Sequence, residues 1–234
     1  MTNTNPELKT FKGGNSTWSS YAWSVLDQCQ DEGFQPLYMP TLVDKVVNGE
    51  LPWDQWFTTP SIKATGETQQ GSKVVVYAHI PTDLVTKEGL LNAWHTTWRR
   101  DVANGAASIG YKEFQQLVDQ DGLTDTRGNR LIWVVDHEIL KTAPSETIHL
   151  DQVLEHPQTI PFLGGQARTE AYLTIHAKKE NTNTFFVSYD DDFNVHACWA
   201  RLLSRSYEHG DARKFKMLHC SDLNDSAQFV GVRK

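Results

Sequence analysis

The sequence predicts an α/β (or α+β) fold in which a mixed β-sheet has helices packed on its faces. Short apolar runs rich in β-branched and aromatic residues recur at Lys73–Ala78, Leu131–Val135 and Thr184–Tyr189, which is typical of strands that are covered on both faces. Stretches with apolar residues at helical spacing lie between these runs. The last third of the chain holds several short strand-like segments in succession, so we expect this C-terminal part to be antiparallel.

The chain divides into a polar leader and one domain. Residues 1–15 carry no periodic apolar pattern and end near a glycine pair, so we expect a flexible leader there. Residues 16–234 contain no repeat, linker or low-complexity tract and have a length that a single α/β domain accommodates. Within this domain, residues 34–60 hold four prolines and two tryptophans. This composition predicts a cap segment of short helices that covers the core.

Helices are predicted from their caps and apolar stripes. Ser16 is a good N-cap residue, and apolar residues then recur at helical spacing as far as Cys29. Gly33 stands where a C-cap glycine belongs. The same signals predict four further helices, near residues 41–48, 86–105, 111–118 and 166–179.

Strands are predicted from apolar runs that are bounded by turn signals. Ser61–Glu67 and Lys73–Ile80 have the pattern of a β-hairpin, joined by a polar loop around Gln69-Gln70-Gly71. The run Leu131–Val135 follows a turn signal at Gly128-Asn129. Four more strands are predicted, near residues 184–189, 200–207, 214–220 and 228–232.

Composition excludes several classes of protein. The net charge of -7 argues against an extended basic surface for duplex DNA, because binding phosphates requires many Lys and Arg side chains. No apolar stretch approaches the roughly 20 residues that span a bilayer. The polar first residues lack the apolar region of a signal peptide. We therefore expect a soluble cytoplasmic protein without a membrane partner. No feature of the sequence fixes the oligomeric state.

The predicted strands end in ionisable side chains. One run ends at His79, another runs into Asp136-His137-Glu138, and a third runs into the aspartates at 190–192. In open α/β sheets ligands bind at the carboxyl edge of the strands. We therefore expect a site there, although a strand that leaves the core becomes polar in any case.

The residue types at this predicted edge favour metal-dependent hydrolysis of a phosphate-containing substrate. Carboxylates from Asp136, Asp190 and Asp192 would hold Mg²⁺ or Mn²⁺. Asp136 and Glu138 lie on one side of an extended strand, and His79 would move a proton. These three residues are the predicted catalytic set. The chain has neither the H-E-x-x-H motif of zincins nor the G-x-S-x-G motif of α/β-hydrolases.

A second candidate binding site precedes the predicted helix 166–179. Gly164 and Gly165 would expose backbone N–H groups to an anion or small molecule at the start of this helix, and Arg168 in its first turn would add charge-assisted hydrogen bonds. The competing interpretation is that the two glycines only allow a loop to pack closely.

Two non-catalytic functions compete with the hydrolase prediction. The chain has eight tryptophans, and aromatic rings form stacking surfaces for sugars or bases, although they more often pack in cores. A small-molecule or carbohydrate binding module is therefore the first alternative. The second is a structural or protein-interaction protein whose contact surface is the segment 34–60.

Overall fold

The computed structural model describes residues 6–13, 22–55, 57–86, 88–89, 109–143, 146–187, 196–202, 216–217 and 227–233. The helices of this described part are α1 (Ala22–Asp31), α2 (Met39–Val47), η1 (Asp83–Val85), α4 (Tyr111–Asp119), α5 (His137–Lys141), η3 (Val153–Glu155), α6 (Thr159–Leu163) and α7 (Gln166–Glu180). Its strands are β1 (Glu7–Lys12), β2 (Gln35–Pro36), β3 (Phe57–Glu67), β4 (Lys73–Ala78), β5 (Ile132–Asp136), β6 (Glu146–His149), β7 (Thr184–Val187), β8 (His196–Leu202), β9 (Lys216–Met217) and β10 (Gln228–Arg233).

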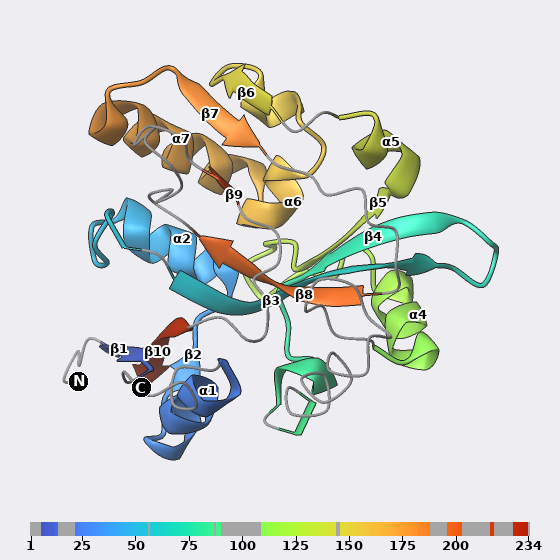
Figure 1. The fold of residues 1–234 in the computed structure, drawn as a ribbon, viewed down its shortest axis with the longest axis horizontal. Coiled ribbons are helices and arrows are strands. Elements are labelled where there is room, and N and C mark those ends of the chain that lie inside the picture. The colour runs from blue at the N-terminus through green and yellow to red at the C-terminus, as the bar shows by residue number, and fades with distance from the viewer. Residues whose placement is uncertain are drawn as a thin grey trace.

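The strands form three sheets, and antiparallel pairing dominates. The central sheet has the order β5-β4-β3-β8, and all its pairs are antiparallel. A second sheet, β1-β10-β2, is also antiparallel. The third sheet, β6-β7-β9, is mixed, because β9 runs parallel to β7. The predicted α/β or α+β class, with helices packed on β-sheets, is therefore confirmed as α+β (Figure 1). The strands are shared among three sheets instead of one mixed sheet, and in the C-terminal part the β7–β9 pair is parallel, not antiparallel.

Strands β3 and β4 of the central sheet are buried on both faces, and the apolar run of β4 predicted this. Side chains alternate along β4, so Val74, Val76 and Ala78 join one hydrophobic cluster while Val75 and Tyr77 join another. Helices α1 and α4 contribute to the first cluster, and α2, α6 and α7 contribute to the second. Figure 1 shows these two groups of helices on opposite sides of the central strands.

Strand β1 corrects the expectation of a flexible leader over residues 1–15. Residues 7–12 pair with β10 along its whole length, with Phe11 opposite Phe229. Phe11 is 2% exposed and packs edge-on against Phe34, with ring centroids 5.3 Å apart. An ion pair between Glu7 and Arg233 joins the two strands at their far end. The first and last described strands therefore lie side by side (Figure 1).

Several predicted helices are confirmed within a residue or two. The predictions at 41–48, 111–118 and 166–179 correspond to α2, α4 and α7. The first predicted helix is described from Ala22 as α1, where Val25 is buried as its stripe required. Most of the predicted helix 86–105 lies outside the described residues.

The strand predictions are partly confirmed. The hairpin β3–β4 and the strands β5, β7 and β10 form where they were predicted. The strands predicted at 200–207 and 214–220 overlap β8 and β9, and their remaining residues lie outside the described part of the chain.

Within the described residues, no helix combines the length and the apolar character that crossing a membrane requires.

Segment 34–60, predicted as a cap, supplies a core helix. Met39, Leu42 and Val43 of α2 are fully buried against the central sheet and α7. Pro40 stands in the first turn of this helix, where its missing N–H costs no hydrogen bond.

We predict that Phe11 is a major source of stability. Phe11→Ala should lower the free energy of unfolding by about 3–5 kcal/mol, because it removes a fully buried ring from the core. Thr10→Ala is the matched control, since Thr10 is an exposed neighbour in the same strand. Urea unfolding at neutral pH measures both variants. Equal and small losses would mean that β1 is not docked on the core in solution.

Candidate functional site

The predicted edge site does not form, because the strands that carry it run in opposite directions. In the β4–β5 pair, Val74 lies opposite Asp136, and the His79 N–H donates to the Leu131 carbonyl. His79 and Asp136 therefore lie at opposite ends of the pair, about 17 Å apart at 3.4 Å per residue. The prediction that these side chains converge is wrong.

His79 is a buried structural histidine. It is 4% exposed, with Nδ1 2.9 Å from Ser61 Oγ and Nε2 2.8 Å from the Pro161 carbonyl oxygen. A carbonyl only accepts, so Nε2 carries the proton and Nδ1 accepts from the Ser61 hydroxyl. Ser61 Oγ in turn accepts the N–H of Met39 at 2.9 Å. Burial lowers the pKa of His79 to about 4, so this neutral side chain ties α2, β3, β4 and α6 together.

Asp136 and Glu138 also have local structural roles. Asp136 is the N-cap of α5, and its Oδ1 accepts the Glu138 N–H at 2.7 Å. The Glu138 side chain points to solvent and lies 3.6 Å from Nδ1 of the buried His137. Asp190 and Asp192 lie outside the described residues. No group of three or more metal-binding side chains occurs within the described part of the chain.

The residues predicted to bind an anion at the start of α7 do line a pocket. Gly164, Gly165 and Arg168 come together with the loop that precedes β5 in a pocket of about 430 Å³, which we call the α7 pocket. The residues that line it are Asp44, Gly128, Asn129, Arg130, Trp133, Gly164, Gly165, Gln166, Ala167, Arg168 and Ala171.

The two glycines do not offer their own N–H groups there, contrary to the prediction. Both donate to the Ile160 carbonyl, at 3.0 and 2.9 Å, and close the end of α6. Gly164 has φ 81°, and a Cβ on it would lie 2.3 Å from Pro40 Cγ. Close packing of the α6–α7 turn on α2 therefore explains Gly164, as the competing interpretation proposed.

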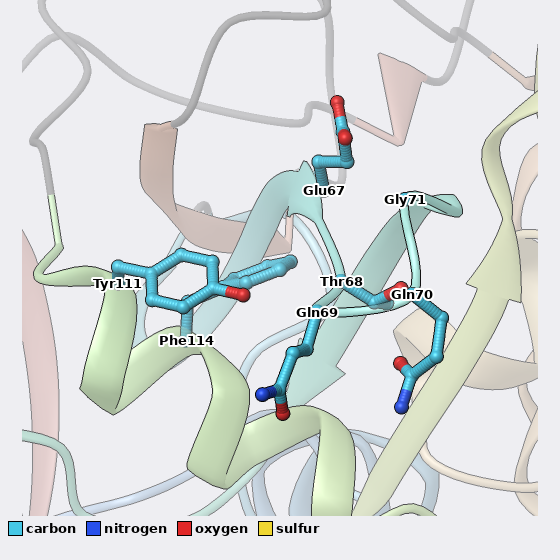
Figure 2. Close-up of a pocket in the computed structure, with 7 residues that line it drawn as sticks. All are labelled: Glu67, Thr68, Gln69, Gln70, Gly71, Tyr111 and Phe114. Atoms are coloured by element: carbon cyan, nitrogen blue, oxygen red, sulfur yellow. The ribbon is translucent and has the colours of Figure 1, made fainter.

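A second pocket, of about 620 Å³, lies between the tip of the β3–β4 hairpin and the start of α4. We call it the hairpin pocket (Figure 2). Its lining residues are Glu67, Thr68, Gln69, Gln70, Gly71, Tyr111 and Phe114.

Packing of α4 against the hairpin holds this pocket in shape. The Phe114 ring is buried directly over Gly66, where a Cβ would lie 2.7 Å from Phe114 Cζ, so only glycine allows this approach. Gln115 Oε1 accepts the Gln69 N–H at 3.0 Å and links the helix to the hairpin tip. The position of the tip relative to α4 is therefore fixed by one apolar and one polar contact.

The tip itself is a closed turn. Thr68 Oγ1 accepts the Ser72 N–H at 3.1 Å, and the Thr68 N–H donates to the Ser72 carbonyl at 2.8 Å. Gly71 adopts φ 82°, a conformation that favours glycine. These bonds occupy the backbone of the turn and leave the side chains of Gln69 and Gln70 exposed.

The pocket offers an aromatic ring beside hydrogen-bonding groups. Tyr111 is 59% exposed at the start of α4, which is unusual for so large a ring. Figure 2 shows Gln69 and Gln70 extending from the hairpin tip on the side of α4, whereas Glu67 points away from them. Amides both donate and accept, so this arrangement suits a ligand with hydroxyl groups and an apolar face.

Sequence reasoning located both halves of this pocket without joining them. The sequence predicts Gln69-Gln70-Gly71 in the hairpin loop and Tyr111 in the helix 111–118. About 40 residues separate them, so no local signal predicts their contact.

The comparisons with known proteins give one full-length similarity. No protein-family model matches the chain, and no curated protein matches it. A chain of a solved structure described as "Accommodation of massive sequence variation in Nanoarchaeota by the C-type lectin fold" is 31% identical. The similarity covers 98% of this chain and 99% of that one, with a TM-score of 0.77.

The prediction of a metal-dependent hydrolase is therefore wrong. The similar structure is described as having the C-type lectin fold, and the described residues bring no group of three or more metal-binding side chains together. These findings favour the alternative of a non-catalytic binding protein.

We predict that Asp136 acts as a helix cap. Asp136→Ala should lower the free energy of unfolding by about 1 kcal/mol, because it removes the acceptor for the first turn of α5. Asp136→Asn should cost less, since an amide oxygen still accepts. Thermal unfolding of the two variants checks this order. A gain in stability with Asp136→Asn would instead indicate a carboxylate held against other negative charges.

We predict that stability falls in weak acid because of His79. Its pKa is lower in the folded chain than the ordinary 6.5, so the unfolded state binds the extra proton. Neutral His79 makes its full contribution to the free energy of unfolding above pH 6.5. This contribution, about 3 kcal/mol, is lost as the pH falls from 6.5 to about 4. Burial also lowers the pKa of His176, which adds to the trend.

The measurement for this prediction is urea unfolding at several pH values between 7 and 4. His79→Gln should be less stable at pH 7 and should show a shallower loss toward pH 4 than the wild type. An unchanged slope in His79→Gln would show that other groups cause the acid sensitivity.

Proposed function

The chain belongs to the family of C-type lectin-fold proteins represented by that solved structure, and from this premise we propose that it is a non-catalytic carbohydrate-binding protein. A fold hosts many functions, so the proposal depends on a site as well as on the family. We assign the carbohydrate to the hairpin pocket.

The single observation that carries the proposal is the exposed Tyr111 ring beside the free amide side chains of Gln69 and Gln70. A sugar ring has one apolar C–H face and a rim of hydroxyl groups. The apolar face stacks on an exposed aromatic ring, and the hydroxyl groups pair with groups that both donate and accept. No described contact occupies these two amide side chains within the folded chain.

Charge favours a neutral sugar over an acidic one. Glu67 is the charged residue among the seven that line the hairpin pocket, and the whole chain has a net charge of -7. A carboxylated or sulfated sugar would approach against this negative potential. Neutral saccharides are therefore the proposed ligands.

The same pocket would tolerate changes of sequence. The similar structure concerns accommodation of massive sequence variation by the fold, and we propose that this chain shares that capacity. Gln69, Gln70 and Tyr111 are exposed and contribute little to the core. Phe114, which also lines the pocket, packs closely against Gly66. Specificity could thus change at the exposed residues while the two buried residues keep the pocket in shape.

We predict that Tyr111 dominates the affinity for saccharides. Saturation-transfer NMR against glucose, galactose, mannose, N-acetylglucosamine and lactose should identify at least one ligand, with glucuronic acid as the anionic comparison. Tyr111→Ala should weaken its binding at least tenfold, about 1.4 kcal/mol, without lowering the melting temperature. Ile139→Ala is the matched control, since Ile139 is also exposed but lies outside the pocket.

Two results would contradict the proposal. One is the absence of saturation transfer to every neutral saccharide of the panel at millimolar concentration. The other is a saccharide that binds wild type, Tyr111→Ala and Ile139→Ala equally well, which would place carbohydrate binding elsewhere on the chain.

A further inference from the structure

We propose that the α7 pocket is a second binding site, and that it takes a small oxyanion, a carboxylate or a phosphate. This pocket differs in chemistry from the hairpin pocket, because two arginines from separate parts of the chain line it. Arg130 precedes β5, and Arg168 stands in the first turn of α7. The inference does not depend on carbohydrate binding at the hairpin pocket.

The first observation is an indole N–H that has no acceptor. Trp133 lies opposite Tyr77 in the β4–β5 pair, and both rings pack in the cluster that faces α6 and α7. The Nε1 atom of Trp133 is fully buried, and no acceptor lies within hydrogen-bonding distance in the described part of the chain. An indole nitrogen only donates, and leaving a buried donor unpaired costs about 1–3 kcal/mol. Because Nε1 is buried, an oxyanion in the pocket would lie beside the Trp133 ring without reaching this N–H, so the two guanidinium groups carry the proposal.

The second observation is that both guanidinium groups are held in place with donors to spare. Arg130 Nε donates to the Ile132 carbonyl at 2.8 Å and its Nη2 pairs with Asp121 at 2.5 Å. Its guanidinium also stacks on the Trp133 ring, 4.2 Å from the ring centroid. These contacts fix the group and leave Nη1 to donate to a ligand.

Arg168 is held in a similar way from the other side of the pocket. Its Nε donates to Asp44 Oδ1 and its Nη1 donates to the Gly164 carbonyl, both at 2.8 Å. The described contacts leave Nη2 available. Two rigid guanidinium groups that each keep a donor suit the several oxygens of a carboxylate or phosphate better than a single neutral hydroxyl.

The remaining groups add more donors than acceptors. The first turn of α7 contains no acidic residue, and Gly165 at its N-cap has no side chain to accept the first N–H groups. Asp44 is the one carboxylate that lines the pocket, and it is paired with Arg168. The lining residues therefore carry one net positive charge in a chain that is negative overall.

The test is a titration of the full chain with inorganic phosphate and, separately, with acetate, at constant ionic strength. The reporters are the ¹H–¹⁵N indole signal of Trp133, assigned with Trp133→Phe, and the backbone amide signals of residues 165–168. We expect a saturable shift of these signals with at least one of the two anions. The anion that saturates identifies which oxyanion the site prefers.

Matched variants test which residues bind the anion. Arg168→Gln and Arg130→Gln should each weaken the apparent affinity at least tenfold, and Arg168→Lys should weaken it less because the charge remains. Arg233→Gln is the control, since Arg233 is an exposed, ion-paired arginine at the far end of β10. It should leave the affinity within twofold, and so should Tyr111→Ala in the hairpin pocket. Each variant is first shown to unfold cooperatively.

Three results would overturn the inference. One is the absence of a saturable shift with both anions up to 50 mM. Another is an affinity that Arg168→Gln and Arg130→Gln leave unchanged. The third is a loss that Arg233→Gln shares, which would reveal a general effect of net charge. If Arg168→Gln fails to fold, Arg130→Gln and Arg168→Lys decide, and an affinity that both leave unchanged would also exclude the site.

Discussion

The structure depends on two central strands, β3 and β4, that are buried on both faces of their sheet. Ten of the eleven residues of β3 are buried, and the side chains of β4 divide between two hydrophobic clusters. Polar side chains inside these strands, such as Ser61, are buried and hydrogen-bonded within the fold, because an unpaired polar group there would be costly. Exposed binding groups therefore stand where the strands leave the core. The hairpin pocket lies at the turn between β3 and β4, and the α7 pocket lies where the chain enters β5.

The strands could be predicted from the sequence, but their directions could not. The apolar run of β4 indicates burial on both faces, and this was correct, whereas in the run Leu131–Val135 only Ile132 is buried and the other residues are half-buried. Parallel and antiparallel pairing use the same apolar residues, so nothing local distinguished them. Antiparallel pairing placed His79 and Asp136 at opposite ends and removed the predicted edge site. The burial of Phe11 could not be predicted either, because one buried side chain in β1 gives no periodic signal.

The two pockets differ in how much of them the sequence could reveal. Gly164, Gly165 and Arg168 are nearly contiguous, so a local pattern was enough to single them out, although the amides of both glycines proved to be occupied. The hairpin pocket joins segments about 40 residues apart through the contact of Phe114 with Gly66. That contact depends on which helix packs beneath the hairpin, and this is a property of the tertiary structure. This buried contact holds the pocket in shape, whereas Gln69, Gln70 and Tyr111 are exposed.

Mapping of backbone amide shifts during titration with a neutral saccharide tests the central claim most directly, because it locates the ligand without any substitution. Carbohydrate binding at the hairpin pocket predicts saturable shifts that cluster at residues 67–71 and 111–115, with the signals of β1 and β10 unchanged. Shifts that cluster elsewhere, with those two segments unaffected at saturation, would contradict the assignment of the site.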